Sequence, residues 1–85
     1  MNNKTKKTLR DIFARPTRSD VAWSDVEKLL SALGAEISEG NGSRVRVLLN
    51  GEIAVFHRPH PERVCSKRCL SSVGRFLKNA GIENP

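Results

Sequence analysis

The chain has few aromatic or sulfur-containing residues and no long apolar run. Its 85 residues include no tyrosine, one tryptophan, three phenylalanines and two cysteines. Two cysteines are too few for the disulfide framework of a small secreted domain. No apolar stretch approaches the ~20 residues that span a bilayer, and the polar residues after Met1 do not resemble a secretory signal. We therefore expect a cytoplasmic protein of one domain that has no membrane segment.

Acidic residues are also in the minority. Nine Asp and Glu stand against 15 Lys and Arg, which gives a formal net charge of +6. An excess of this size in so short a chain favours a polyanionic partner, and nucleic acid is the simplest one. The basic residues are spread along the chain, so we expect a folded basic surface and not a disordered arm. The alternative is a small basic domain that binds no nucleic acid.

The spacing of apolar residues predicts two main helices. One carries an apolar stripe at helical spacing and ends at Gly34, which suits the left-handed position after a helix. Residues 24–27 have the form of a capping box that would start it. The other helix begins near Ser66 and ends at Gly81. The stripe of the first helix consists of Val26, Leu29, Leu30 and Leu33.

A shorter basic helix is expected near the N-terminus, over residues 4–14. Leu9, Ile12 and Phe13 lie on one side of it, and Pro16 ends it because proline disfavours helix in the residue before it. We therefore divide the chain into an N-terminal basic helix with its linker, residues 1–22, and a main domain, residues 23–85.

Three strands are expected between the two main helices, over residues 35–39, 44–49 and 52–57. The second alternates polar and apolar residues, which is typical of a half-buried strand. Asn50-Gly51 favours a two-residue hairpin turn. The predicted fold is α+β, in the order helix, three antiparallel strands, helix. Both helices should cover one face of the sheet, because each has a single apolar stripe to bury.

The two-residue turn fixes which side chains share a face, because directly opposed residues point the same way. It places Arg44 opposite His57 and Leu48 opposite Ile53. The face toward the helices carries Val45, Val47, Leu49, Ala54 and Phe56. The opposite face carries Arg44, Arg46, Leu48, Ile53, Val55 and His57.

This second face has the groups needed to cleave a phosphodiester. Arginines hold phosphate through forked hydrogen bonds, and a histidine can act as general base on a ribose 2′-hydroxyl or as acid to the leaving oxygen. We assign catalysis to His57 and Arg44, with His60 as a second candidate for proton transfer. An exposed apolar strip would suit a protein partner; it comprises Leu48, Ile53 and Val55. The alternative is an ordinary hairpin with solvated arginines and an incidental histidine.

Further basic residues lie around the third strand and the start of the last helix. We assign RNA contacts to Arg46, Arg58, Arg63, Lys67 and Arg68. Cys65 and Cys69 are interpreted as free thiols, and we assign no metal ligand and no cofactor. A zinc site made by these thiols with His57 and His60 is the weaker alternative.

The order and spacing of these elements resemble the HicA family of toxins. The resemblance rests on Gly42-Ser43 before the second strand, Asn50-Gly51 in the hairpin and the His-Pro pair at residues 60–61, within residues 23–81. It implies a fold like that of double-stranded-RNA-binding domains. It also implies an mRNA-cleaving endoribonuclease of a type II toxin–antitoxin system, silenced by a HicB-type antitoxin in a heterotetramer or larger complex.

One position departs from the family pattern. The family's usual catalytic histidine follows the Gly-Ser pair directly, and here that position is Arg44. Because His57 lies opposite Arg44 in the predicted register, we expect the imidazole to act from the neighbouring strand, without a metal ion. Arg44 or Arg46 would stabilise the charge of the phosphorane. Two alternatives stay open, a catalytically inactive RNA-binding module of this fold and a protein-interaction module with a basic face.

Overall fold

A computed structural model describes residues 1–60 and 62–83 of the chain. Pro61, which contributes to the His-Pro pair, and the last two residues of the predicted domain lie outside the described residues. The elements follow the order α1, α2, β1, β2, β3, α3. Their bounds are Asn3–Phe13, Trp23–Ala32, Glu36–Glu39, Arg44–Leu49, Glu52–His57 and Lys67–Asn79, respectively.

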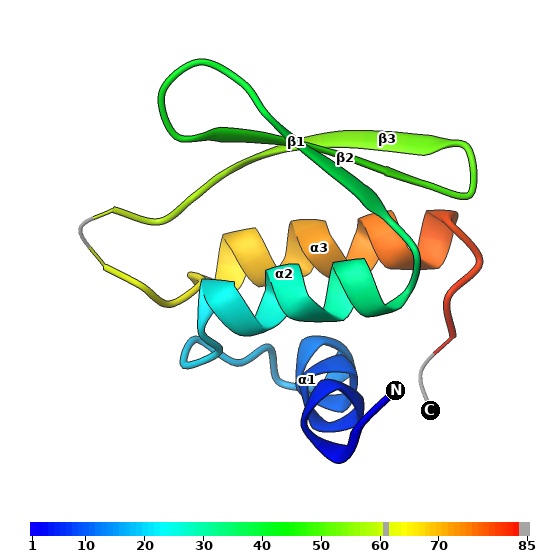
Figure 1. Cartoon of the computed structure of the whole chain (residues 1–85). Coiled ribbons are helices and arrows are strands. Elements are labelled where there is room, and N and C mark those ends of the chain that lie inside the picture. Colours follow the sequence, from blue (N-terminus) through cyan, green and yellow to red (C-terminus); the bar gives the residue numbers. More distant parts are fainter. Residues whose placement is uncertain (61, 84–85) are drawn as a thin grey trace.

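The elements form layers, as Figure 1 shows. The three strands make one antiparallel sheet in the order β1-β2-β3. Helices α2 and α3 run beneath one face of this sheet, and α1 packs on them from the side away from the sheet. The α+β fold expected from the sequence is therefore confirmed, with the two main helices on one face. Within residues 1–60 and 62–83, no helix lies over the other face of the sheet.

The hairpin between β2 and β3 has the predicted register throughout. Arg44 pairs with His57, and Leu49 pairs with Glu52 next to the turn. Asn50 and Gly51 have φ angles of 51° and 82°. Both angles are positive, as a two-residue type I′ turn requires, and asparagine and glycine adopt this conformation most readily. The turn sequence therefore determines which residues face away from the helices.

The predicted capping box at the start of α2 is wrong. The helix begins at Trp23, its N-cap is Ala22, and no side chain caps it. Tertiary contacts hold the chain at the start of this helix instead. Ala22 forms a β-bridge with Val64, and the Trp23 amide donates to the Arg63 carbonyl at 2.9 Å. Glu27, the predicted capping acid, hydrogen-bonds to other side chains.

The hydrophobic core lies between the sheet and the helix pair and extends to α1. Fully buried residues come from α2, β2 and α3. From α1, Leu9 and Ile12 are 4% and 1% exposed, and both belong to the same core. A Cβ on the buried Gly74 of α3 would lie 3.5 Å from Ile12 Cγ2, an ordinary van der Waals distance, so α1 packs directly against α3 at this point. Among the described residues, no helix is long and apolar enough to cross a membrane.

Candidate functional site

The uncovered face of the β2–β3 hairpin carries the predicted catalytic residues. Three pairs of opposed residues project from it: Arg44 with His57, Arg46 with Val55, and Leu48 with Ile53. The Arg58 amide donates to the Ser43 carbonyl at 2.9 Å, next to the first of these pairs. Arg44 and His57 therefore form a non-hydrogen-bonded pair, the kind in which opposed side chains lie closest. The strand pairing thus places Arg44 and His57 in neighbouring positions on this face.

These polar side chains are accessible and available. Arg44, Arg46 and His57 are all exposed. Within residues 1–60 and 62–83, no ion pair or side-chain hydrogen bond engages any of the three. A guanidinium without a carboxylate partner keeps its donors for an anionic ligand such as a phosphodiester.

An apolar patch adjoins the polar pair on this face. Ile53 and Val55 are 53% and 55% exposed, and Leu48 is half-buried. Most apolar side chains of a small domain lie in its core, so two adjacent exposed aliphatic residues on a sheet face are typical of a surface that a partner covers. The predicted partner-binding residues therefore lie together, beside the histidine and the arginines.

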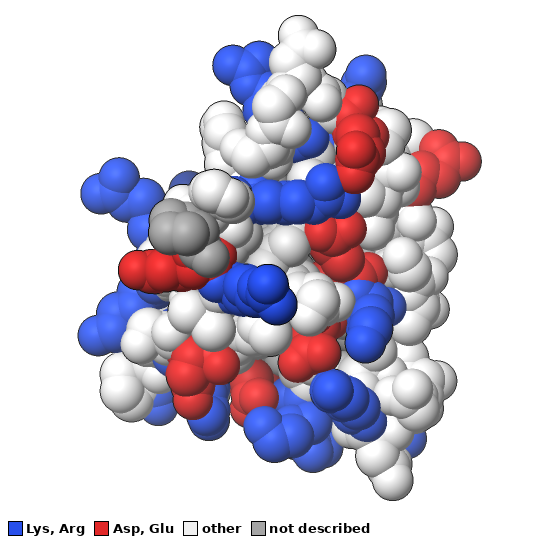
Figure 2. All heavy atoms as spheres, turned by 60° about the vertical axis from the view of Figure 1, so that its left-hand side comes forward, with Lys and Arg blue, Asp and Glu red and all other residues white. Residues whose placement is uncertain are grey.

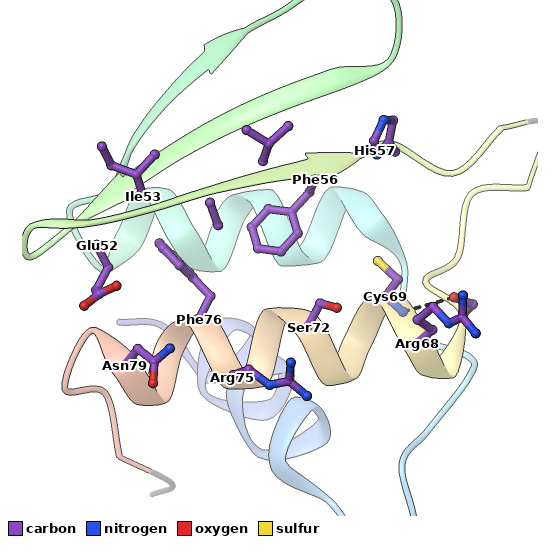
Figure 3. A pocket seen from close by; sticks show the side chains of 13 residues that line it. Glu52, Ile53, Phe56, His57, Arg68, Cys69, Ser72, Arg75, Phe76 and Asn79 are labelled. Atoms are coloured by element: carbon purple, nitrogen blue, oxygen red, sulfur yellow. Dashed lines mark hydrogen bonds between the residues drawn. The ribbon is translucent and has the colours of Figure 1, made fainter.

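A groove separates β3 from α3, as Figure 3 shows. It has a volume of about 520 Å³. One wall is the stripe of α3 formed by Arg68, Ser72, Arg75 and Asn79. His57 lies near one end and Glu52 near the other. Phe56 and Phe76 line it from within, with ring centroids 5.8 Å apart in an edge-to-face arrangement.

Ser72 and Arg75, which line this groove, were not among the site residues predicted from the sequence. Arg68 and Arg75 are seven residues apart, which places them on one side of a helix with a rise of about 10.5 Å between them. That spacing is visible in the sequence, but only the packing of α3 against β3 shows that this side faces a groove. Both arginines are exposed.

The second histidine lies close to the first. His57 and His60 line the same small cavity of about 260 Å³, together with Cys69. His60 comes from the segment after β3 and is exposed. The two predicted proton-transfer residues therefore border one space, as an acid and a base that act on one substrate must.

Arg58 has different surroundings from the other predicted RNA-binding residues. Its Nε lies 2.9 Å from Glu27 Oε2, and its Nη1 lies 2.6 Å from Glu39 Oε1. Hydrogen bonds to these two carboxylates raise the pKa of Arg58. The bond from Arg58 also lowers the pKa of Glu27, which accepts a further hydrogen bond from Trp23 Nε1. Arg58 thus ties β1, α2 and the end of β3 together.

The remaining predicted contacts lie near the start of α3. Arg63, Lys67 and Arg68 are exposed, and the last two are the first residues of the helix after its N-cap, Ser66. Helix N-termini attract anions through their free amides. Figure 2 shows Lys and Arg side chains distributed among carboxylates on this side of the molecule, so the positive charge is not gathered into one continuous patch there.

The thiols and histidines do not assemble a metal site in the described part of the chain. No group of three or more His, Cys, Asp or Glu side chains lies close enough there to hold an ion. Cys65 and Cys69 are free, and their sulfur atoms are 3.0 Å apart.

The family model described as HicA toxin of bacterial toxin-antitoxin matches residues 23–82, from the start of α2 to just beyond α3. Searches of curated proteins and of solved structures gave no match. The family match covers well over half of the chain, and we conclude that the protein belongs to the HicA toxin family of bacterial toxin–antitoxin systems.

Proposed function

We propose that this toxin is a type II, mRNA-cleaving endoribonuclease that uses histidine chemistry without a metal ion and acts in the cytoplasm. The observation that carries the proposal is the Arg44–His57 pair, an exposed guanidinium and an exposed imidazole directly opposed on adjacent strands. It supports an imidazole acting from β3 at a site where the family pattern has its histidine on β2.

The proposed reaction needs one base, one acid and one anion-stabilising group. His57 removes the proton from a ribose 2′-hydroxyl, whose oxygen attacks the adjacent phosphorus. Arg44, or Arg46 on the next pair, holds the non-bridging oxygens and stabilises the charge of the phosphorane. His60, which borders the same cavity as His57, protonates the departing 5′-oxygen. The products are a 2′,3′-cyclic phosphate and a free 5′-hydroxyl.

The RNA chain is proposed to continue from this pair toward the start of α3. Lys67 and Arg68 are exposed at that helix N-terminus, where phosphate is favoured, and Arg63 precedes them. Arg75 would extend the contact along the groove wall. Arg58 is omitted from this path, because Glu27 and Glu39 already occupy its guanidinium.

A HicB-type antitoxin is the proposed partner at the apolar patch. Leu48, Ile53 and Val55 lie on the same sheet face as the catalytic pair, so a protein seated on them would also cover His57. Neutralisation would then be steric, with substrate and antitoxin competing for one face. We expect the neutralised form to be a heterotetramer or a larger complex.

A second candidate function is RNA binding without cleavage. It is favoured by Arg44, which stands where the family has its usual histidine and which is exposed as a phosphate contact would be. This version predicts salt-dependent RNA binding with no turnover of RNA. A protein-interaction module, the third possibility, predicts little salt-dependent affinity for RNA.

Induced expression in a bacterial host distinguishes these functions. The wild type is compared with His57→Ala, Arg44→Ala, His60→Ala and, as a matched control, Arg10→Ala on the exposed side of α1. We expect growth arrest and loss of intact mRNA for the wild type and the control, and neither effect for His57→Ala. Absence of arrest with a soluble, folded wild type would contradict ribonuclease activity and favour the binding module.

A further inference from the structure

Cys65 and Cys69 are held as a pair at the start of α3. Cys65 directly precedes the N-cap, Ser66, and Cys69 is the third residue of the helix. Their sulfur atoms lie 3.0 Å apart, in hydrogen-bond contact. A disulfide bond is about 2 Å long, so a bond between them requires the sulfurs to approach by only about 1 Å. The two thiols are therefore already positioned for one another.

The two thiols differ in their access to solvent. Cys65 is 0% exposed, and its amide donates to the Val21 carbonyl at 2.8 Å, which fixes it against the segment before α2. Cys69 is half-buried and lines both the groove and the small cavity beside His57. Figure 3 shows its sulfur directed into the groove. A reagent in solution therefore reaches Cys69 and not Cys65.

The surroundings of Cys69 favour its thiolate. It lies in the first turn of α3, where the free amides of the helix end attract negative charge, and it follows Lys67 and Arg68. The hydrogen bond with Cys65 lowers the pKa of the Cys69 thiol, whereas that bond and burial raise the pKa of Cys65. The accessible thiol, Cys69, is thus the better nucleophile, and the buried thiol of Cys65 stays protonated.

We propose that this pair is a modification site at which low-molecular-weight disulfides oxidise the protein, with Cys69 as the attacking thiol and Cys65 as the resolving thiol. The Cys69 thiolate attacks one sulfur of the small disulfide, forms a mixed disulfide and releases one small thiolate. Cys65 then attacks the Cys69 sulfur, and its proton goes to the second small thiolate as that leaves. The pair loses two electrons and two protons, and the small disulfide becomes two small thiols.

The inference is independent of ribonuclease activity and is tested with glutathione disulfide and the reduced full chain. We expect the wild type to lose the mass of two hydrogens and both titratable thiols while remaining a monomer. Cys65→Ala should stop at the mixed disulfide and carry one glutathionyl group. Cys69→Ser should remain unmodified under native conditions, because Cys65 is buried, and should react once denatured.

Three results would overturn the inference. They are a wild type that stays reduced, a wild type that retains a glutathionyl group, and a folded Cys69→Ser variant that reacts as fast as the wild type. If Cys65→Ala fails to fold, the wild type and Cys69→Ser still decide the question. A disulfide in the wild type together with no reaction of Cys69→Ser supports the assigned roles. Any other combination contradicts them.

Discussion

The position of one imidazole is the main question at the residue scale. Arg44 and His57 are the two members of one non-hydrogen-bonded pair, so their side chains occupy neighbouring positions on the same face. If catalysis requires only that the imidazole lie on this face, whichever strand carries it, exchanging the two residues should preserve the chemistry. The double variant Arg44→His with His57→Arg also restores histidine to the family's usual position.

We predict that the exchanged variant cleaves RNA, whereas the single variant His57→Arg does not. Cleavage of a labelled RNA by the two purified proteins provides the measurement, with circular dichroism to check that both are folded. An inactive exchanged variant with normal RNA affinity would show that the imidazole must project from β3. Cleavage by His57→Arg itself would remove His57 from the mechanism.

The hydrogen-bonded ion pair of Glu27 with Arg58 is expected to make the stability of the fold depend on pH. The pKa of Glu27 lies below its ordinary value of 4.5, mainly because Arg58 donates a hydrogen bond to it. A carboxyl group with a lowered pKa stabilises the fold above its unfolded-state value, and this contribution is lost as pH falls through the folded-state value. Glu27→Gln should therefore lower the melting temperature at neutral pH, and its difference from the wild type should shrink as pH falls below 4.5.

Thermal unfolding across this pH range measures the effect. Glu36→Gln is the matched control, because Glu36 is exposed on β1 and takes no part in the Arg58 ion pairs. A pH-independent difference between Glu27→Gln and the wild type would mean that the ion pair does not contribute through the charge of Glu27.

The role of Arg58 could not be predicted from its own residue type. In the sequence it is one of several arginines near histidines and prolines, which suggested contact with RNA. Its partners, Glu27 and Glu39, are 31 and 19 residues away along the chain. Only the folded arrangement of α2, β1 and β3 brings these carboxylates to it, so local sequence patterns carry no sign of the interaction.

At the scale of elements, the hairpin turn also anchors α3. The side-chain amide of Asn50 donates to the Ala80 carbonyl at 2.8 Å, which joins the turn to the end of the last helix. Asn50 also has a φ of 51°, a conformation that most residues adopt at a cost. One residue therefore stabilises both the turn and its contact with α3.

Two substitutions separate these contributions. Asn50→Gly keeps the backbone conformation and loses the hydrogen bond, so we expect a loss of about 1 kcal/mol in the free energy of unfolding. Asn50→Ala loses the bond and adds backbone strain, for about 2 kcal/mol in total. Chemical denaturation measures both. Equal stability of Asn50→Gly and the wild type would show that the bond to Ala80 contributes nothing.

The elements themselves were largely predictable, because their signals are local. Asn50-Gly51 specifies a turn and a register, and the register alone separates the buried face from the exposed face. The start of α2 was not predictable in this way. Ser24 and Glu27 have the sequence of a cap, but the bridge between Ala22 and Val64, which are far apart in sequence, determines where the helix begins.

At the scale of the whole molecule, α1 is continuous with the rest of the core. Residues 1–22 lie outside the family match, yet Ile12 is 1% exposed and packs toward Gly74 of α3. The division of the chain at residue 22 stays a prediction, and the cooperativity of unfolding tests it. If α1 shares the core, its loss should destabilise every element.

We predict that Ile12→Ala lowers the free energy of unfolding by about 2–5 kcal/mol, as expected for a large apolar side chain removed from a core. Lys6→Ala, on the exposed side of α1, should change it by less than about 0.5 kcal/mol. Tryptophan fluorescence at Trp23 and far-ultraviolet circular dichroism should report one shared transition. Separate transitions in the wild type would show that α1 unfolds independently of the other elements.

The groove between β3 and α3 is a property of the whole fold and could not be predicted from the sequence. Its two walls come from elements that are separate in the chain, and the stripe containing Arg68 and Arg75 is ambiguous until the packing of α3 is known. The proposed catalytic face, by contrast, lies within one hairpin. This difference explains why the pairing of Arg44 with His57 could be predicted from the sequence, whereas the position of Arg75 beside the groove could not.

Cleavage of RNA by purified protein in the presence of a metal chelator tests the central claim most directly, with the wild type and His57→Ala side by side. The account predicts that the wild type produces fragments with 2′,3′-cyclic phosphate ends, and that His57→Ala, folded and still able to bind RNA, produces none. Cleavage by His57→Ala at the wild-type rate would contradict it.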